Sequence, residues 1–545
     1  MKKQNYLQGA LILMLASVIV KIFGAIFKIP LTNIIGVTSM AYFNTAYGFY
    51  VVFYMISTAG IPVALSKMIS AADARGNKKE VAKIFKVSYW LFFILGVIGL
   101  LTMAIFAKTY SSYVKLDGLH MSIIAISPTL FFMCLISAYR GYFQGRKNMA
   151  PTAISQVIGA MGKLFLGLIV AIIAVKSGAK DYMVAAYTIL GITIGSVAAC
   201  AFLSIYKMVC DKKEETSEDS SQKVPTSKAL LKNIVEIAIP ITLSATILSL
   251  TNTIDTTLMV RRLSVSGVAV EEATKIMGAY TSMSIPLFNL SPNLIYPFAI
   301  SVIPTITALF VSKKDDEAKS IISSTFRISS IIAIPCALGL SVFARPIISM
   351  LYKNSETIFV PLKNSEVTAV SVAAEMLSIL AISIFFVSMV SVTNGILQAY
   401  GKEKLTIIST SIGIISKIIL NYILIGIESI NIYGAPISTL ICYFIIMILN
   451  FYFLVSNCNY RPKPTQIVFK PLICAVLGVG LSALIYNLIY SHFDTKITTI
   501  IAISIAVIIY FIAIFLVKGI EKSDIEMLPK GKKIIRLLNC LKLLR

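Results

Sequence analysis

Residues 7–36 read LQGALILMLASVIVKIFGAIFKIPLTNIIG and place two lysines on the path of an otherwise uncharged apolar helix. Ser17, Lys21, Gly24 and Lys28 recur at helical spacing, so they share one face of the predicted helix. A charge at the centre of a bilayer costs at least about 2.5–3.5 kcal/mol. This face therefore predicts either a polar cavity inside the protein or lysine side chains that reach back to the lipid headgroups. We favour the cavity for Lys21, which lies deeper in the helix, and leave both readings open for Lys28.

The whole chain has the composition of a membrane protein. Of its 545 residues, 57% are hydrophobic and only 14% are charged, and the mean hydropathy is +0.85. Soluble domains carry about 25% charged residues. The net charge of +24 would suggest a nucleic-acid partner in a soluble chain, but here the basic residues lie mostly in short loops between apolar segments. We therefore expect an all-α polytopic membrane protein, with no nucleic-acid partner.

Apolar segments of spanning length recur from end to end, and we predict fourteen transmembrane helices. The predicted spans are 6–27, 39–66, 84–107, 121–142, 151–175, 182–206, 233–260, 277–311, 328–350, 369–397, 405–426, 431–455, 471–490 and 497–517. The span 277–311 contains Pro286, Pro292, Pro297 and Pro304 and is too long for one straight helix, so we expect it to be kinked or broken.

The distribution of lysine and arginine predicts the orientation. With the N-terminus in the cytoplasm, and with Lys86, Arg140 and Arg345 near span ends counted on the nearer side, 34 of these residues fall on the cytoplasmic side and 12 on the outer side. Lys21, Lys163 and Lys417 lie deeper within spans. Positive charge is enriched in cytoplasmic loops of membrane proteins. We expect a multi-pass protein of the cytoplasmic membrane with both termini in the cytoplasm.

An internal repeat indicates two related halves. Residues 140–170 and 394–424 align without gaps at an offset of 254, with ten identities in 31 positions that include Lys163 with Lys417. Six helices separate the two copies, so both have the same orientation, which is a plan found in transporters. The repeat predicts two pseudo-symmetric six-helix lobes, and it leaves open whether the paired lysines serve function or architecture.

The lobes and the remaining segments give five predicted parts. A Ser/Glu/Lys-rich segment has the make-up of a flexible linker, and the C-terminal tail is basic and amphipathic. The parts are an N-terminal lobe (1–210), a cytoplasmic linker (211–232), a C-terminal lobe (233–457), transmembrane helices 13 and 14 (458–518) and a cytoplasmic tail (519–545).

Cations outnumber acids in the predicted spans, which favours an anionic substrate. Lys21, Lys28, Arg261 and Arg262 are the candidate substrate-binding cations. Asp255, Glu375, Lys163 and Lys417 are candidate coupling or structural residues, and Asp255 could pair locally with one of the two arginines. The sequence shows no metal-ligand spacing, no disulfide framework and no catalytic motif, so we expect neither an enzyme nor a metal or cofactor.

Four stretches carry a family resemblance: residues 7–36, TIDTTLMVRRL (253–263), GAYTSMSIPLFNLSPNLIYPFAISVIPTIT (278–307) and LQAYGK (397–402). They resemble the multidrug/oligosaccharidyl-lipid/polysaccharide (MOP) exporter superfamily, and within it the stage V sporulation protein B and MurJ-like lipid II flippases. The resemblance implies two six-helix lobes plus a terminal pair, alternating access, and a groove for a polyprenyl tail formed in part by helices 13 and 14. It assigns Lys21, and approximately Lys28, to cavity cations of the first helix. The acid early in helix two and the central arginine of helix eight, found in Gram-negative relatives, are missing here.

The resemblance implies a flippase for an undecaprenyl-pyrophosphate-linked glycan, acting as a monomer in the phospholipid bilayer. The membrane potential and a monovalent ion are both open as its energy source. Two alternatives are a multidrug or cation antiporter of the same fold and a non-transporting membrane scaffold in envelope or spore assembly. The scarcity of acids in the spans, mainly Asp255 and Glu375, disfavours the cation antiporter.

Overall fold

A computed structural model describes residues 6–212, 224–353, 356–458, 460–490, 494–521 and 524. Half of the predicted linker 211–232 and most of the tail 519–545 lie outside the described residues. The chain divides into two compact units, of which unit 1 comprises residues 1–264 and 268–278 and unit 2 comprises 265–267 and 279–545.

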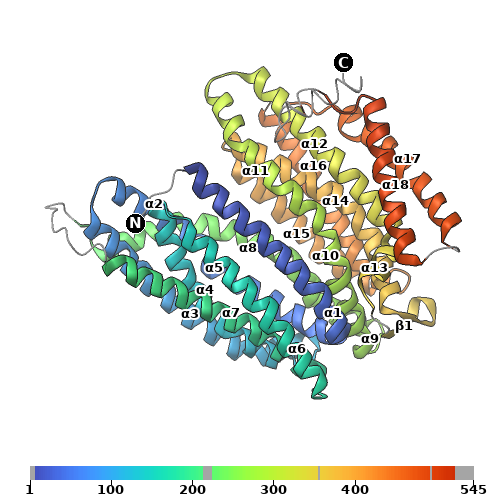
Figure 1. The fold of residues 1–545 in the computed structure, drawn as a ribbon, viewed down its shortest axis with the longest axis horizontal. Coiled ribbons are helices and arrows are strands. Elements are labelled where there is room, and N and C mark those ends of the chain that lie inside the picture. The colour runs from blue at the N-terminus through green and yellow to red at the C-terminus, as the bar shows by residue number, and fades with distance from the viewer. Residues whose placement is uncertain are drawn as a thin grey trace. The chain divides into compact units, whose positions relative to one another are not determined.

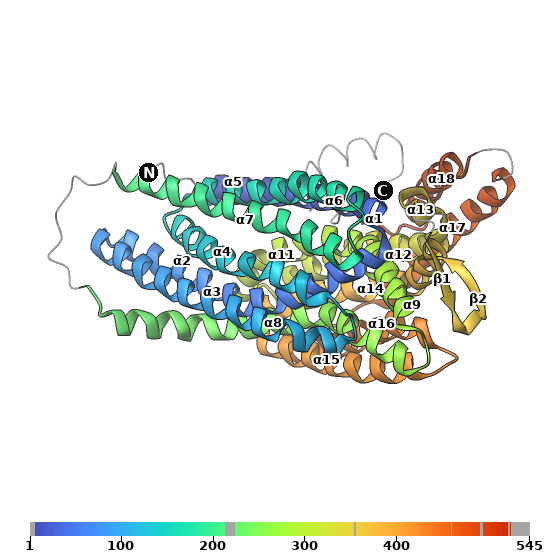
Figure 2. The ribbon, with the colours of Figure 1, turned by 90° about the horizontal axis from the view of Figure 1, so that it is seen from below.

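Unit 1 is a bundle of long helices (Figure 1). Its elements are α1 (Tyr6–Thr58), α2 (Ile61–Ala74), α3 (Lys78–Val114), α4 (Leu119–Gly145), α5 (Ala150–Met161), the π-helical turn η1 (Gly162–Leu166), α6 (Gly167–Lys176), α7 (Asp181–Lys212), α8 (Ser227–Val265) and α9 (Val270–Ala279). α5 and α6 run end to end through η1 and pack along α7 (Figure 2).

The first two predicted spans are joined in α1. The helix is interrupted only at Gly36, whose φ of 75° and ψ of 172° are non-helical. A side chain would be strained at this φ, so glycine permits the break. The predicted boundaries 27 and 39 are therefore replaced by one broken helix, and the second predicted span ends earlier, at Thr58, before α2 begins.

Small residues bring α5–η1–α6 against α7. A Cβ on Gly162 would lie 2.3 Å from the Cα of Gly195, and one on Gly191 would lie 2.4 Å from the backbone nitrogen of Gly167. Such glycine contacts let helix backbones approach closely inside a membrane, where packing rather than the hydrophobic effect joins helices.

Helix α8 packs within unit 1, although the predicted lobe boundary places it with the second half of the chain. The hydroxyl of Thr253 donates to the carbonyl oxygen of Gly48 at 3.3 Å, and the hydroxyls of Tyr110 and Thr257 lie 2.8 Å apart. These contacts hold α8 on α1 and α3, so the compact units divide after Ser264 rather than at 211–232. The five-part organisation of the sequence stays a prediction.

Unit 2 holds the remaining helices and one β-hairpin. Its elements are the π-helical turn η2 (Tyr280–Ser284), α10 (Ile285–Phe288), α11 (Leu290–Val311), α12 (Asp315–Val342), α13 (Ala344–Leu351), β1 (Thr357–Val360), η3 (Pro361–Lys363), β2 (Ser365–Thr368), α14 (Ala369–Ala399), α15 (Glu403–Gly426), η4 (Asn431–Tyr433), α16 (Gly434–Cys458), the π-helical turn η5 (Thr465–Phe469), α17 (Lys470–Ile489) and α18 (Thr495–Leu516). The predicted break within 277–311 is confirmed by η2 and by the end of α10 at Phe288. The antiparallel β1–β2 hairpin, with Thr357 opposite Thr368, was not predicted.

The sequence repeat reappears in the helix ends and in one polar contact. α4 ends at Gly145 and α14 at Ala399, at the repeat offset. In the first copy Arg140 Nε donates to Ser155 Oγ at 3.0 Å. In the second copy the matching Ser409 donates to Asn450, which in turn donates to Asn394, the residue that matches Arg140, at 2.8 Å. Each copy therefore ties the same two helix positions together, directly or through an added asparagine.

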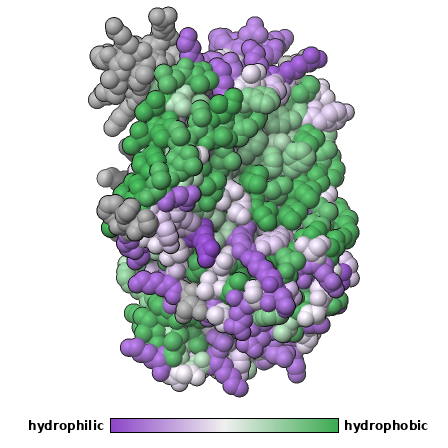
Figure 3. Space-filling model, turned by 90° about the vertical axis from the view of Figure 1, so that its right-hand side faces the viewer, coloured by the Kyte–Doolittle hydropathy of each residue, from purple (hydrophilic) through white to green (hydrophobic). Residues whose placement is uncertain are grey.

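The described residues include eleven helical segments long and apolar enough to span a membrane. The face drawn in Figure 3 shows a broad band of hydrophobic side chains with hydrophilic groups above and below it. The outer surface of α18 contributes exposed apolar side chains to such a band, namely Ile497, Ile500, Ile508, Ile512 and Leu516. The protein is thus a nearly all-helical, multi-pass membrane protein, consistent with about fourteen spans.

Candidate functional site

An apolar groove with a volume of about 680 Å³ runs between α12 and the α17–α18 pair of unit 2. Its walls are hydrocarbon over most of their length. The groove side of α12 consists of Ile328, Ile331, Ile332, Pro335, Cys336, Gly339 and Leu340, and that of α18 consists of Ile503, Ala506, Val507, Tyr510 and Phe511. A groove with these walls fits a long hydrocarbon chain rather than a compact charged molecule.

Proline and glycine shape the α12 wall. Pro335 has no N–H to donate to the carbonyl oxygen of Ile331, one turn earlier. The hydroxyl of Tyr510 on α18 donates to that oxygen instead, at 2.8 Å. One turn further on, a Cβ added to Gly339 would meet nothing within 4 Å. The α12 wall is therefore hydrogen-bonded to α18 at Ile331, and the space beside Gly339 is open.

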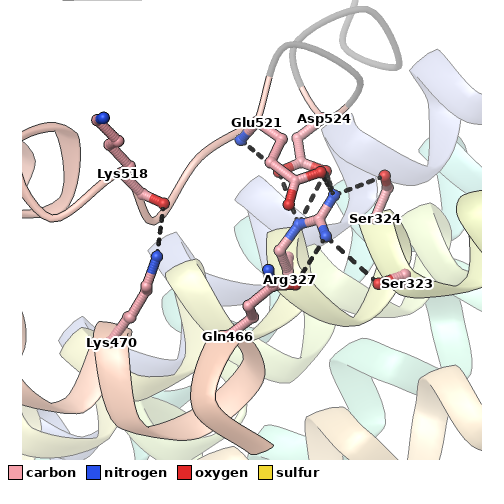
Figure 4. A network of polar contacts seen from close by, with 8 residues as sticks. All are labelled: Ser323, Ser324, Arg327, Gln466, Lys470, Lys518, Glu521 and Asp524. Carbon is pink, nitrogen blue, oxygen red and sulfur yellow. Dashed lines mark hydrogen bonds and ion pairs between the residues drawn. The ribbon is translucent and has the colours of Figure 1, made fainter. Parts of the chain in front are cut away.

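A buried ion pair lies at one end of the groove (Figure 4). Arg327 on α12 is 4% exposed and Asp524, which follows α18, is 1% exposed. Their nitrogen and oxygen atoms form a two-pronged contact of 3.0 and 2.8 Å, and Arg327 Nη2 also lies 2.8 Å from Glu521. Arg327 Nη1 donates to Gln466 at 3.2 Å and to Ser323 at 3.3 Å. This arginine thereby joins α12, η5 and the segment that follows α18.

A polar pocket of about 610 Å³ lies at the same end, and we call it the inner pocket because the basic residues predict this end to be cytoplasmic. Its lining residues are Asp316, Lys319, Ser320, Ser323, Arg327, Val455, Tyr460, Arg461, Lys463, Gln466 and Glu521. Burial raises the pKa of the Tyr460 phenol above its usual range, although its contact with Ser323 and the charge of Arg327 oppose this rise. Tyr460 is therefore a neutral hydroxyl at physiological pH.

A second polar pocket, of about 860 Å³, lies at the other end of the groove, and we call it the outer pocket. It is lined in part by Arg345, Asp494 and Lys496, and by the aromatic rings of Tyr486 and Tyr490. Phe343 lines both this pocket and the apolar groove. The groove therefore has a polar region at each end.

The structure brings three of the sequence-predicted lysines to α1 and to the turn that packs on it. Lys21 is exposed and Lys28 is half-buried. Lys163, in η1, lies 5.0 Å from the ring centroid of Phe27 and 5.0 Å from that of Tyr47. Such cation–π contacts stabilise a desolvated ammonium group. Lys163 thus belongs to the same part of unit 1 as Lys28, and a role for these lysines in substrate binding stays a prediction.

The other predicted residues are dispersed over the two units. Arg261 is exposed and packs on the ring of Tyr113 at 4.3 Å, and Arg262 is half-buried. Asp255 is buried in unit 1 with 2% exposure. In unit 2, Lys417 is buried with 1% exposure.

Glu375 lies near the start of α14 and holds the β-hairpin turn and η4 together. It pairs with Lys363, next to the β-hairpin, and accepts a hydrogen bond from the Tyr433 hydroxyl at 2.6 Å. This carboxylate is thus engaged with a cation of the protein itself.

Comparison with models of known protein families identifies the family of this chain. The family model for polysaccharide biosynthesis proteins matches residues 6–310. The chain belongs to the polysaccharide biosynthesis protein family. A second model, MatE, matches residues 240–423. Both are MOP superfamily models, as the sequence resemblance predicts.

Three relatives of the family come from Bacillus subtilis (strain 168). The uncharacterized membrane protein YabM is 26% identical over 82% of this chain and 79% of its own length. Stage V sporulation protein B is 23% identical over 98% of this chain and 100% of its own length. Lipid II flippase MurJ is 24% identical over 87% of each chain.

Solved structures of the superfamily share the fold. The inward closed conformation of lipid II flippase MurJ matches with a TM-score of 0.65 and 15% identity, over 92% of this chain and 98% of its own. An inward-facing MATE multidrug resistance transporter matches with a TM-score of 0.63 and 13% identity, over 81% of this chain and 95% of its own. The chain is therefore a membrane protein of a superfamily of transporters and flippases.

The polar residues at the Arg327 end of the groove were not predicted from the sequence. Arg327 precedes the predicted span 328–350 by one residue, and Asp524 falls in a tail treated only as basic. The available signal was a lone arginine among serines, in SSTFRISS (323–330), together with Glu521 and Asp524 shortly after the last span. Only tertiary packing shows that these charges meet.

Proposed function

We propose that this protein translocates an undecaprenyl-pyrophosphate-linked cell-wall precursor, lipid II or a related lipid-linked oligosaccharide, across the cytoplasmic membrane by alternating access. The apolar groove along α12, α17 and α18, with a polar pocket at each end, is the observation that carries this proposal. The flippase and sporulation relatives extend over 87% and 98% of this chain, which supports the same substrate class.

The shape of the groove matches an amphiphile with a long chain. From Arg327 to Phe343 is sixteen residues, or roughly 24 Å of helix, which approaches the hydrocarbon thickness of a bilayer. A hydrocarbon chain in this groove leaves the lipid phase for a protein wall of the same polarity. Its charged headgroup can then move while the tail stays in an apolar medium.

The positions of the acidic residues argue against an antiporter of organic cations. Such a substrate needs a buried carboxylate as its counter-ion. Of the two acids predicted in the spans, Glu375 already pairs with Lys363 and accepts a hydrogen bond from Tyr433, which leaves Asp255 as the buried one. The cations Lys21, Lys28 and Lys163 instead favour an anionic headgroup.

Transport can be tested with purified full-length protein in proteoliposomes that contain fluorescent lipid II. We expect translocation of lipid II and no efflux of an organic-cation dye. Dye efflux without lipid translocation would favour the antiporter, and neither activity would favour the scaffold.

Two glycines provide a matched pair of variants for this assay. Gly339 lies in the groove and Gly480 lies outside it on α17, and a Cβ on either residue meets nothing within 4 Å. Gly339→Phe fills the groove, so we expect at least about a tenfold loss of transport, whereas Gly480→Phe adds the same bulk elsewhere. Equal transport by the two variants would contradict a role for the groove.

A further inference from the structure

We propose that the inner pocket binds the diphosphate headgroup of the prenyl lipid whose chain lies in the apolar groove. This inference rests on the function proposed above and adds a headgroup site that is separate from Lys21 and Lys28. In this proposal the lipid first binds at the Arg327 end of unit 2.

The pocket and the groove adjoin along two segments of chain. On α12, Arg327 lines the pocket and the next residue, Ile328, lines the groove. After α18, Ile520 lines the groove and Glu521 lines the pocket. A single amphiphile can therefore occupy both, with its head on the polar side of Arg327 and its chain on the apolar side.

The charges of the pocket suit a diphosphate. Four cations line it, Lys319, Arg327, Arg461 and Lys463, against the two acids Asp316 and Glu521. Arg461 and Lys463 are exposed, and neither has an ion pair with a residue in the described part of the chain. Asp316 is fully exposed and lies 3.8 Å from Lys319. Arg461 and Lys463, which lie between α16 and η5, can therefore bind phosphate oxygens. Such oxygens form strong charge-assisted hydrogen bonds with these cations.

Hydroxyl donors complete the pocket. Ser320, Ser323 and Arg327 share one face of α12 with Lys319 because their spacings are those of a helix. The neutral phenol of Tyr460 faces them from the segment after α16. The pocket therefore offers both positive charge and neutral donors, as recognition of a diphosphate requires.

The carboxylate of Glu521 occupies the position beside Arg327 where we propose that a phosphate binds. The Glu521 side chain is 47% exposed and lies 2.8 Å from Arg327 Nη2, while the side chain of the neighbouring Asp524 is only 2% exposed. An incoming phosphate displaces the exposed Glu521 from the guanidinium group, and the buried Asp524 remains. Removal of the Glu521 charge should therefore strengthen diphosphate binding, which a purely structural ion pair would not predict.

The experiment measures lipid binding to the purified full chain in detergent by native mass spectrometry. The probes are undecaprenyl diphosphate, undecaprenol, phosphatidylglycerol and inorganic pyrophosphate. For undecaprenyl diphosphate we expect Arg461→Gln/Lys463→Gln to bind about tenfold more weakly than the wild type and Glu521→Gln to bind several-fold more tightly. Undecaprenol binding should be the same in all three proteins.

Lys402→Gln/Lys404→Gln is the matched control, because it removes two exposed lysines from the start of α15, on the same predicted side of unit 2. It should leave every affinity unchanged. Unchanged undecaprenyl diphosphate binding by Arg461→Gln/Lys463→Gln would overturn the headgroup site. If the wild type bound inorganic pyrophosphate or phosphatidylglycerol as tightly as undecaprenyl diphosphate, the specificity of the site for a prenyl diphosphate would be overturned. A wild-type protein that binds no undecaprenyl diphosphate would instead contradict the proposed function itself.

Discussion

The hydroxyl of Tyr510 on α18 donates a hydrogen bond to the backbone carbonyl of Ile331 on α12, at 2.8 Å. Pro335 explains this contact, because it lacks the N–H that an α-helix would direct to the same oxygen. Tyr510 is 4% exposed and Ile331 is 8% exposed, so water does not replace the missing donor. The proline thus creates a bare acceptor in the groove wall, and the tyrosine of the terminal helix pair satisfies it.

Tyr510→Phe should destabilise unit 2 because it leaves the Ile331 carbonyl without a donor. We expect a cost of about 1–3 kcal/mol. Pro335→Ala restores the helical N–H, so the tyrosine change should cost much less in that background. Unfolding midpoints of the two single variants and the double variant, measured in one detergent, form the required cycle. An equal cost in both backgrounds would show that the proline and the tyrosine act independently.

The Arg327–Asp524 pair should behave as a buried ion pair. Arg327→Gln or Asp524→Asn leaves one charge without its main partner, and we expect a loss of about 3–5 kcal/mol of stability. Arg327→Lys keeps the charge but loses the two-pronged geometry, so its cost should be smaller but measurable.

The double variant Arg327→Met/Asp524→Leu distinguishes a charge effect from a packing effect. It removes both charges together, and its unfolding midpoint should lie above that of either single variant. Surface variants of the exposed Lys232–Glu236 pair, which are 75% and 61% exposed, serve as the control and should change stability little. A double variant less stable than both single variants would contradict the interpretation.

The fold was largely predictable because a bilayer permits few solutions. Helix existence and the break within 277–311 follow from hydropathy and proline positions. The continuity of α1 through Gly36 did not follow, because a glycine between two apolar runs is compatible with either a loop or a bend.

The candidate site was less predictable because its parts are far apart in the sequence. Arg327 and Asp524 are 197 residues apart and meet only through the packing of α12 with the C-terminal segment. Hydropathy counts Pro335 and Gly339 as ordinary span residues, although they shape the groove wall. Lys21 and Lys28 stand out because they lie inside apolar runs, whereas Arg327, one residue before a predicted span, resembles an ordinary topology signal.

The side of the membrane can be tested through the linker. Single cysteines placed within 213–223 of a cysteine-free background should resist a membrane-impermeant thiol reagent in intact cells and react after permeabilisation. The basis is the excess of lysine and arginine on the predicted cytoplasmic side, 34 against 12. A cysteine in the 361–364 turn of the hairpin, predicted to lie outside, is the positive control. Labelling of the linker in intact cells would show that the orientation is the opposite of the predicted one.

Lys21 provides the last prediction, and its place on α1 gives the physical reason. The side chain is exposed, as is that of the neighbouring Ile22, so this part of α1 faces lipid or a cavity rather than the core of unit 1. Lipid at this depth costs at least about 2.5–3.5 kcal/mol for the charge, which favours a hydrated cavity. There the ammonium group can hold a pyrophosphate loosely and release it. Outward movement of the anion also gains about 2.3 kcal/mol per charge per 100 mV from the membrane potential.

The measurement is complementation of a flippase-depleted strain at matched expression. Lys21→Ala should fail to support growth, because the pyrophosphate then crosses the low-dielectric layer without its counter-ion. Lys21→Arg should rescue growth in part, because it keeps the charge on a bulkier head. Lys28→Ala should be milder, since Lys28 lies nearer the break at Gly36, where a side chain can reach the headgroups. Full growth with Lys21→Ala would mean that this lysine also reaches the headgroups and plays no part in transport.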